Sequence, residues 1–414
     1  MGPILTSRRG RRQSLRKGEI ATDRRYSEMS QSSGKGGALT GKPLSIAIVG
    51  AGIGGLAAAA TLRQVGHHVT VYEQARAFAR VGAGIQQSPN AVKVLRGLGL
   101  EDRLRERAFR PESSLNRKHN SGEITWERML GAKVEEKYGA PYFYMHRGDL
   151  HEALAAIVPE ETVRREKKLV GLAQHDESVR LEFTDGSEAS ADLAIGADGV
   201  HSVVRETLWG AEAPRFTGRV AYRTTFPASL MGGATIDGSA KWWGPDRHIV
   251  MYYVTPQRDE IYFVTSTPEP DFQVESWSAK GDLDMLRDAY KDFHPQVSTV
   301  LAACRDVHKW ALFERDPMPQ WRKGRVTLLG DSCHPMTPYM AQGAATSIED
   351  AAVIARCLAG VGHDGIESAL QQYEEHRKPR TARIQQISRL NDLDKIKMET
   401  ARVFSYDAWH EILS

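Results

Sequence analysis

Three glycine-rich runs, each with an acidic residue in it or after it, contain the residue types of this chain that could do chemistry. In the first run, Gly50, Gly52 and Gly55 stand at the spacing GxGxxG, and Glu73 follows 23 residues after Gly50. Gly50 permits a tight turn, Gly52 lets backbone approach a pyrophosphate, and Gly55 lets a helix pack closely on a strand. Glu73 would accept hydrogen bonds from a ribose 2′-hydroxyl, and we expect its neighbour Gln74 to contact the same ligand. This run predicts dinucleotide binding.

The second and third runs begin at positions 196 and 330, that is 146 and then 134 residues further along the chain. They read Gly196-Ala197-Asp198-Gly199 and Gly330-Asp331-Ser332-Cys333-His334-Pro335. Asp331 suits a ribityl hydroxyl. Pro338, Gly343 and Ala344 then lead into an expected helix at 348–355, whose N-terminus would favour an anionic flavin ring. The order and spacing fit a chain that returns twice to one bound dinucleotide, which favours a flavoenzyme.

These runs need a parallel sheet to position them. Short apolar runs at 46–49, 68–72, 193–195 and 325–329 are typical of buried parallel strands, and residues 56–63 are helical in pattern. A glycine-rich loop at 80–90, which includes Gly84 and Gln86, could run against a flat cofactor. Arg147 stands where a strand gives way to a helix at 142–150 and could meet the flavin's phosphate or ribityl chain, although such an arginine is as often part of a surface ion pair.

The segment between the second and third runs is aromatic and β-branched. Residues 222–226, 247–254 and 261–266 are expected to form antiparallel strands. Alternation places His248, Val250, Tyr252 and Val254 on one face. A histidine and a phenol two pleats apart could jointly bind a polar aromatic substrate, while a satisfied core pair or an exposed sheet face is the structural alternative.

Composition limits the function classes. A chain of 414 residues with 41% hydrophobic residues is expected to form two domains and a terminal appendage. Cys304, Cys333 and Cys357 form neither a CxxC pair nor a metal-like cluster, so we expect no metal, a reducing compartment and a cytoplasmic location. No apolar run is typical of a membrane span. Residues 1–42 hold ten Lys/Arg and three Asp/Glu, and 1–44 is expected to be a disordered basic tail, with a nucleic-acid arm or transit peptide as the alternatives.

Over about residues 45–380 the chain resembles the single-component FAD-dependent aromatic hydroxylases, the family of para-hydroxybenzoate and salicylate hydroxylases. The resemblance rests on the three runs together, with Arg205 after the second. It implies an α/β fold: a Rossmann-like FAD-binding domain at 45–218 and 319–365, an interleaved β-sheet substrate domain at 219–318 and a C-terminal helical segment at 366–414. We expect that segment to be a solvated helix covering the FAD domain. By this likeness Glu73, Arg147, Asp198, Gly199 and Asp331 become FAD contacts.

Within the family the chain is most similar to the hydroxylases of 6-hydroxynicotinate, whose substrate-site histidine and tyrosine match His248 and Tyr252. Three positions depart from that pattern: Gln86 and Tyr339 stand where histidines are expected, and Ser239 stands where a cysteine is expected. We count His248, Tyr252, Tyr339 and Gln86 as catalytic candidates. Because the departures replace titratable or soft groups by neutral hydrogen-bonding groups, a related hydroxypyridine carboxylate or a hydroxybenzoate is as credible a substrate as 6-hydroxynicotinate.

The resemblance also implies the reaction. NADH or NADPH reduces FAD, O₂ adds to give a flavin hydroperoxide, and that electrophile hydroxylates an electron-rich ring carbon, with loss of CO₂ if that carbon bears the carboxylate. We expect a small aromatic acid and O₂ as partners, no nucleic acid, no membrane, and a monomer or homodimer. A flavin oxidoreductase of the same fold that does not hydroxylate, or an inactive flavin-binding scaffold, is the alternative.

Overall fold

The computed structural model describes residues 41–78, 83–272 and 279–413. Most of the expected basic tail, residues 1–40, lies outside these ranges. The boundary expected at residue 44 is too late, because Leu44 is only 2% exposed and its carbonyl accepts a hydrogen bond from His68 N at 2.9 Å. In the described ranges no helix has both the length and the apolar character needed to cross a bilayer.

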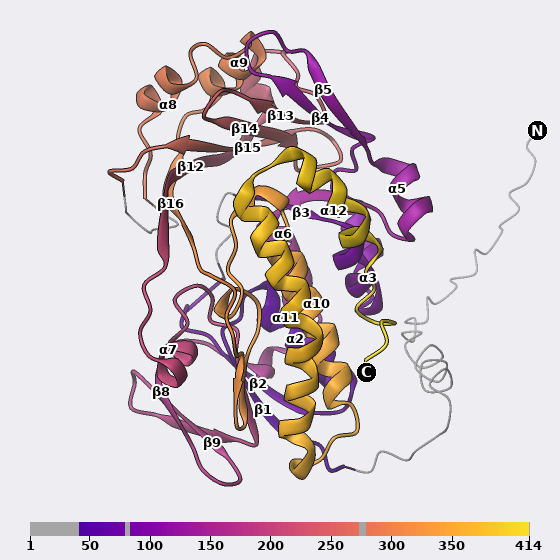
Figure 1. Cartoon of the computed structure of the whole chain (residues 1–414), viewed down its shortest axis with the longest axis vertical. Helices are drawn as coiled ribbons and strands as arrows, with labels where there is room; N and C mark the ends of the chain where they lie inside the picture. Colours follow the sequence, from indigo (N-terminus) through magenta and orange to yellow (C-terminus); the bar gives the residue numbers. More distant parts are fainter. Residues whose placement is uncertain (1–40, 79–82, 273–278, 414) are drawn as a thin grey trace, which may run out of the picture. The chain divides into compact units, whose positions relative to one another are not determined.

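A mainly parallel sheet lies at the centre of the first hydrophobic core (Figure 1). In spatial order its strands are β17 (Arg322–Lys323), β18 (Val326–Leu328), β11 (Leu193–Gly196), β1 (Ser45–Val49), β2 (His68–Tyr72) and β7 (Val163–Arg164). All neighbours pair in parallel except β17 and β18. The buried apolar runs read from the sequence therefore form the expected strands, and all three glycine runs follow carboxyl ends of adjacent strands of one sheet.

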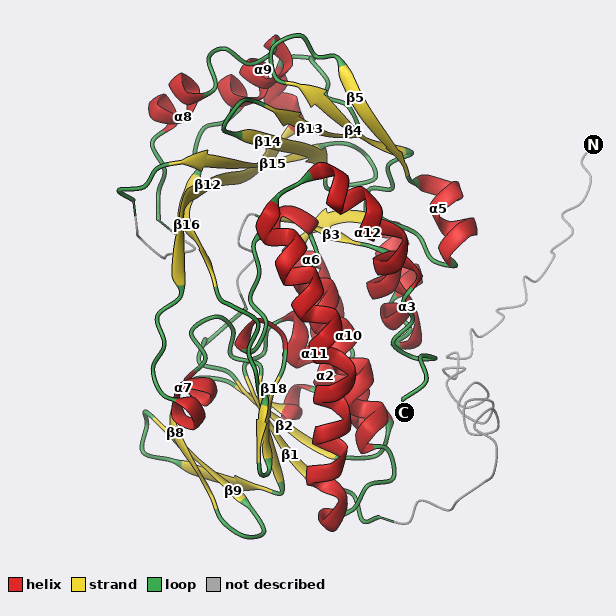
Figure 2. Cartoon of the chain, viewed as in Figure 1, coloured by secondary structure: helices red, strands yellow, loops and turns green. Residues whose placement is uncertain are grey.

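Helices cover this sheet and continue beyond it (Figure 2). They are α2 (Ile53–Gln64), α3 (Pro89–Gly97), α4 (Glu101–Arg107), α5 (Gly131–Tyr138), α6 (Arg147–Ala155), α7 (Val203–Trp209), α10 (Gly343–Leu358), α11 (Ile366–Leu390) and α12 (Leu393–Ser405). Two short 3₁₀ turns, η3 (Gly330–Ser332) and η4 (Pro338–Met340), interrupt the third glycine run and its continuation. The alanine-rich helix α2 packs between β2 and α10, and α10 packs on α11.

A second, seven-stranded sheet forms the other core. Its spatial order is β16 (His308–Glu314), β12 (Arg215–Pro227), β15 (Glu260–Pro268), β14 (His248–Tyr253), β13 (Ser239–Trp243), β4 (Ser113–Lys118) and β5 (Ile124–Met129). Two helices, α8 (Leu283–Ala289) and α9 (Pro295–Ala303), contribute Leu286, Val297 and Val300 to the same buried cluster as Ile249 and Met251. The expected antiparallel strands between the second and third glycine runs are confirmed.

Two strands of this sheet come from a part of the chain that the sequence assigned to the FAD-binding segment 45–218. Strand β4 pairs in parallel with β13, so that Asn116 stands opposite Lys241, and β5 extends the sheet from β4. The assignment of 113–129 to the FAD-binding segment is therefore wrong. Parallel neighbours need a long connection, and this one runs from residue 119 to residue 238.

Smaller elements complete the fold. One is a three-stranded antiparallel sheet of β8 (Leu169–Gln174), β9 (Val179–Phe183) and β10 (Glu188–Ala191); the other pairs β3 (Gly84–Gln87) with β6 (Phe143–His146). The C-terminal segment departs from expectation. Helix α11 buries a stripe along the FAD-binding part, but Val403 and Phe404 of α12 join the core of the second sheet.

Candidate active site

The turn between β1 and α2 has the geometry that the first glycine run predicts. Gly50 has a φ of 101°, in the left-handed region that favours glycine. A Cβ on Gly50 would stand 2.5 Å from the carbonyl oxygen of Ala197, and one on Gly55 would stand 2.0 Å from that of Gly50. Gly52, by contrast, has no atom within 4 Å of its Cβ direction, and no side chain caps the first turn of α2. The loop is closed against the protein and open on the side where a phosphate would bind the helix N-terminus.

Glu73 lies at the end of β2 and is partly buried. Its carboxylate accepts hydrogen bonds from Ala51 N and Ala75 N, both at 2.8 Å. Because a carboxylate has about four acceptor positions, Glu73 can hold the glycine loop and still accept from a ribose hydroxyl. Gln74 is exposed beside it.

A cavity, here called the glycine cavity, brings together most of the expected cofactor contacts. Eight of them line it: Gly52, Gly84, Arg147, Gly199, Asp331, Pro338, Gly343 and Ala344. Gly50 and Gly55 shape the loop behind it, while Glu73, Gln74 and Asp198 do not line it. The glycine cavity therefore unites parts of all three glycine runs, as their order along the chain predicts.

A carboxylate and a guanidinium, those of Asp331 and Arg147, line the polar part of this cavity. Asp331, on η3, is exposed to the cavity, and the surrounding protein raises the pKa of its carboxyl, an effect that His334 and Arg147 oppose. Arg147 is the first residue of α6; burial lowers the pKa of its guanidinium, and the charge of Asp331 opposes this shift. A carboxylate and a guanidinium that line the same cavity as the open glycine loop suit a ribityl hydroxyl and a phosphate.

Asp198 has a different role in this structure from the expected one. Its carboxylate accepts hydrogen bonds from Ser202 Oγ at 2.6 Å and from Val204 N at 3.1 Å. Arg205, nearby, donates to the carbonyls of Ser332 and Val200. Burial raises the pKa of Asp198. Asp198 thus stabilises the start of α7, and its contact with a cofactor stays a prediction, while Gly199 does line the cavity.

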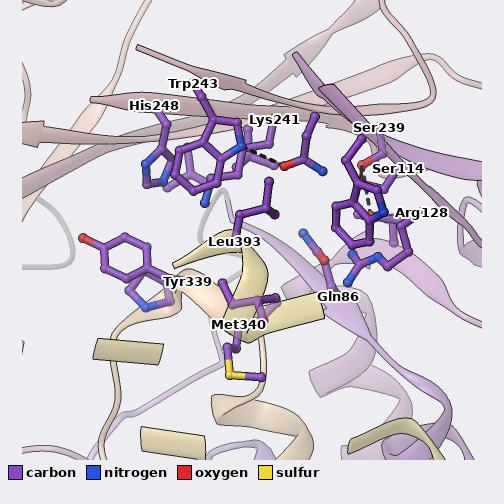
Figure 3. A pocket seen from close by; sticks show the side chains of 18 of the residues that line it. Gln86, Ser114, Arg128, Ser239, Lys241, Trp243, His248, Tyr339, Met340 and Leu393 are labelled. Atoms are coloured by element: carbon purple, nitrogen blue, oxygen red, sulfur yellow. Dashed lines mark hydrogen bonds between the residues drawn. The ribbon is translucent and has the colours of Figure 1, made fainter. Parts of the chain in front are cut away.

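A second cavity, here called the sheet cavity, lies between β13 and β14 on one side and η4 and α12 on the other (Figure 3). Alternate residues of β13 line it: Ser239, Lys241 and Trp243. His248 and Val250 of β14 line it too, whereas Ile249 and Met251 face the core with α9. Four residues, Gln86, Val264, Pro338 and Ala341, line both cavities, so the two adjoin.

His248 and Tyr339 lie together in the sheet cavity. His248 is 5% exposed, and its ring stands 5.1 Å from that of Trp243 and 5.5 Å from that of Tyr339. The Tyr339 hydroxyl hydrogen-bonds with Ser266 Oγ at 2.9 Å. Burial, with the charges of Lys241 and Arg219, lowers the pKa of His248 well below its ordinary 6.5. The imidazole of the ligand-free protein is therefore neutral at pH 7.

Tyr252 and Gln86 stand at the junction of the two cavities. Tyr252 lines the glycine cavity and not the sheet cavity, with its ring 4.5 Å from Tyr144 and 5.1 Å from Tyr262. Burial raises the pKa of its phenol well above 10.0, so it stays protonated. Gln86 Oε1 accepts from the Tyr142 hydroxyl at 2.6 Å. His248 and Tyr252 thus lie on one face of β14, as expected, but they line two neighbouring cavities.

Cations in the sheet cavity were missed by sequence reasoning. Lys241 Nζ lies 3.7 Å from the centroid of the Trp243 ring, and Arg128 lies over the rings of Trp126 and Tyr142. Figure 3 shows His248, Trp243 and Tyr339 at one end of the cavity and Arg128 and Gln86 at the other. The alternation Ser239, Lys241, Trp243 was a signal for Lys241. Arg128 gave none, because its strand was not assigned to this sheet.

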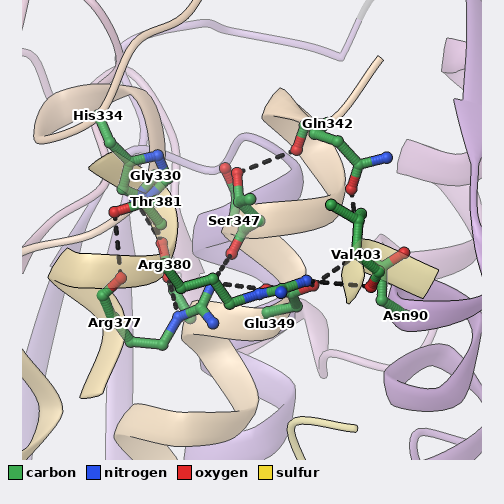
Figure 4. Close-up of polar contacts among 12 residues, drawn as sticks. Asn90, Gly330, His334, Gln342, Ser347, Glu349, Arg377, Arg380, Thr381 and Val403 are labelled. Carbon is green, nitrogen blue, oxygen red and sulfur yellow. Dashed lines mark hydrogen bonds and ion pairs between the residues drawn. The ribbon is translucent and has the colours of Figure 1, made fainter. Parts of the chain in front are cut away.

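A buried ion network holds the third glycine run in place (Figure 4). Arg377 of α11 donates to Glu349 Oε2 and to Asp350 Oδ1 of α10, each at 2.7 Å, and all three side chains are 0% exposed. Asp350 Oδ2 in turn accepts from Gly330 N at 3.1 Å and contacts His334 Nε2 at 2.6 Å. Burial alone would raise the pKa of Asp350, but His334 and Arg377 bring it below its usual value. The packing of α10 on α11 thereby fixes the loop that presents Asp331.

Comparison with known proteins decides the family. A family model described as an FAD binding domain matches residues 44–388. The 6-hydroxynicotinate 3-monooxygenase of Bordetella bronchiseptica is 43% identical over 91% of this chain and 98% of its own length, and that of Pseudomonas fluorescens is 41% identical over 88% and 95%. The chain is an FAD-dependent aromatic monooxygenase.

The fold of this monooxygenase has solved counterparts. Klebsiella pneumoniae HpxO complexed with FAD and uric acid superimposes with a TM-score of 0.76 at 26% identity, covering 88% of this chain and 93% of that one. FAD is the cofactor of the enzyme. The residues present fit it, because Gly52 leaves room at an uncapped helix N-terminus and Asp331 and Arg147 face the same cavity.

Proposed function

We propose that this monooxygenase hydroxylates a small aromatic acid that also bears a ring hydroxyl, with 6-hydroxynicotinate or a related hydroxypyridine carboxylate as the substrate class. The observation that carries this proposal is the sheet cavity. It adjoins the glycine cavity through Gln86, Val264, Pro338 and Ala341, and among the described residues that line it there are cations and neutral hydrogen-bonding groups but no carboxylate. Such a lining favours an anion.

The similarity to two 6-hydroxynicotinate 3-monooxygenases supports the pyridine ring. The side chains of Gln86, Ser239 and Tyr339 are neutral hydrogen-bonding groups, which can bind the substituents of a benzene ring as well as those of a pyridine ring. A relative from Streptomyces cremeus, 39% identical over 84% of this chain, is a 3-amino-4-hydroxybenzoate 2-monooxygenase. A hydroxybenzoate is therefore the second candidate.

When bound and reduced by NADH or NADPH, FAD supplies the activation of O₂. The chain's own residues then have three tasks. His248, as a neutral imidazole, can accept the proton of the substrate hydroxyl, which increases the electron density of the ring. The Tyr252 phenol lines the glycine cavity and the Gln86 amide lines both cavities, and the two can orient the ring edge toward the flavin, while Tyr339 can hydrogen-bond a substrate oxygen.

A histidine here could act as a base or as a cationic partner of the substrate carboxylate. The lowered pKa of His248 favours the role of base, because the imidazole is then neutral. Leu393, Ile396 and Met340 add apolar surface to the same cavity and help to exclude water.

Substrate screening tests the reaction. Purified enzyme is incubated with NADH or NADPH and a panel of hydroxypyridine and hydroxybenzoate carboxylates, and stimulated oxidation of the reduced nicotinamide is followed with mass analysis of the product. A product heavier by one oxygen supports hydroxylation, and loss of CO₂ in addition identifies attack at the carboxylate-bearing carbon. Stimulated oxidation with no organic product would contradict the proposal.

Substitution tests the residues. His248→Ala and Tyr252→Phe are expected to lower kcat on the order of 100-fold or more and 10-fold respectively, while FAD stays bound. Tyr253→Phe is the matched control, because Tyr253 lies on the opposite face of β14, where its hydroxyl accepts from Ile236 N. Wild-type rates in both test variants would remove His248 and Tyr252 from the site.

A further inference from the structure

We propose that Lys241 is the anion-binding residue of the sheet cavity and that its ammonium forms an ion pair with the carboxylate of the substrate. This inference deepens the proposed function, on which it rests, by assigning the group that recognises the acid. It is carried by the position of Lys241, by its few partners and by the surroundings of the other cations nearby.

Lys241 stands in the middle of β13, where its side chain points into the cavity between Ser239 and Trp243. Its Nζ lies over the Trp243 ring at 3.7 Å and 5.8 Å from the centroid of the Tyr339 ring. It donates one hydrogen bond of 3.3 Å, to Asn391 Oδ1 in the link between α11 and α12. An ammonium has three donors, so two remain for a ligand in the cavity.

In the described ranges no carboxylate forms an ion pair with Lys241, and Asn391 is its one hydrogen-bond acceptor, so it has weaker polar partners than two other lysines that are partly enclosed. Lys309 is paired with Glu269. Lys93 donates to three backbone carbonyls, at 3.3, 2.9 and 3.2 Å. A buried charge is normally compensated by a partner. For Lys241, an anionic ligand in the cavity would be the partner that compensates the charge.

Of the two neighbouring arginines, Arg219 has other partners, whereas Arg128 has a buried Nε without a hydrogen-bond partner in the described ranges and is therefore the alternative anion-binding residue. Arg219 already donates to Ser266 Oγ, to the carbonyl of Ser266 and to that of Asp246. Arg128 lines the cavity but lies over three aromatic rings, those of Trp126, Tyr142 and Phe404. Lys241 instead lies over the Trp243 ring, which stands 5.1 Å from the His248 ring, and its Nζ is 5.8 Å from the centroid of the Tyr339 ring. A ring whose carboxylate contacts Lys241 therefore has both candidate hydrogen-bonding groups beside it.

This assignment predicts the ligand class. The enzyme should prefer an aromatic monocarboxylate to the amide of the same ring, because an ion pair in a cavity largely shielded from water discriminates strongly by charge. The preference should depend on Lys241 and not on Arg128.

Binding is measured by titrating the FAD absorbance of the oxidised holoenzyme with 6-hydroxynicotinate and 6-hydroxynicotinamide, and with 4-hydroxybenzoate and 4-hydroxybenzamide. The variants are Lys241→Met, Lys241→Gln and Arg128→Met, with Lys118→Met as the matched control. Lys118 stands on the adjacent strand β4, with its side chain 52% exposed and paired with Glu123. FAD content and the melting temperature establish that each variant is folded, and Lys241→Gln serves if Lys241→Met does not fold.

For Lys241→Met or Lys241→Gln we expect acid binding weakened by about 30-fold or more and amide binding changed by less than about threefold. An unchanged preference in these variants, or a loss of preference in Arg128→Met alone, overturns the assignment, as does a wild-type enzyme without preference for the acid. If the acids bind through Lys241 but none is turned over, the proposed function fails and the anion site stands. If the acids are turned over and Lys241→Met binds them normally, the proposed function stands and the assignment of Lys241 fails.

Discussion

A buried charged side chain without an ion-pair partner lowers the free energy of unfolding. The pKa of Lys241 lies well below its ordinary 10.5, first because of burial and then because of the charges of Arg128 and Arg219. Between the folded pKa and the unfolded pKa the unfolded chain binds more protons, so stability rises with pH across that interval. The cost is therefore fully present below the folded pKa, and it has gone above pH 10.5.

Lys241→Met should remove this cost. At pH 7, without aromatic acid, we expect the variant holoenzyme to be more stable than wild type by on the order of 1 kcal/mol, and the difference should shrink as the pH approaches 10. Thermal melts over this pH range check it, with Lys118→Met as the exposed control. A variant that melts below wild type throughout would show that Lys241 stabilises the empty cavity.

At the scale of elements, α10 and α11 act as one unit because their charges meet inside the protein. Arg377 lies between two carboxylates, Glu349 and Asp350, and the same Asp350 receives the backbone N–H of Gly330. Removing one partner of a buried ion pair leaves an uncompensated charge. The consequence should reach the cofactor, since the loop of Gly330 and Asp331 would lose its support.

Arg377→Met is accordingly expected to destabilise the enzyme by about 3–5 kcal/mol and to weaken FAD binding. Urea unfolding and FAD titration measure the two effects. Arg383→Met, on the same helix, is the comparison: its partner is Glu399, its side chain is 50% exposed, and the expected loss is about 0–1 kcal/mol. Equal losses in the two variants would contradict a special role for the buried network.

At the scale of the whole molecule, the fold class and the meeting of the three glycine runs at one cavity could be predicted because they depend on local patterns. A buried apolar run followed by Gly50, Gly52 and Gly55 predicts both the strand and the turn that follows it. The pairing of Asn116 with Lys241 joins residues 125 positions apart and has no local signature. Its absence from the predicted sheet is the reason why Arg128 was overlooked. The contact of Asp198 with the cofactor stays a prediction, because the same residue type serves a helix start and a ribose equally well.

The pairing of β4 with β13 also constrains how the enzyme can be rebuilt. A chimera that takes only residues 219–318 from a relative should show lower FAD content and a lower melting temperature than one that takes 113–129 as well. In the first chimera Ser114, Asn116 and Arg128 of the host would line a cavity whose β13, β14 and β15 residues are foreign. Equal properties of the two chimeras would show that β4 and β5 are interchangeable among relatives.

A consequence for the evolution of specificity follows from the same pairing. The walls of the sheet cavity are encoded at residues 86 and 144 and in stretches around residues 113–129, 239–266, 338–341 and 393–396, with cofactor-binding sequence between them. A single crossover between two related genes cannot exchange all of them. New substrates should therefore arise in such enzymes through scattered point substitutions, of the kind expected at Gln86, Ser239 and Tyr339, more readily than through the transfer of one continuous block of sequence.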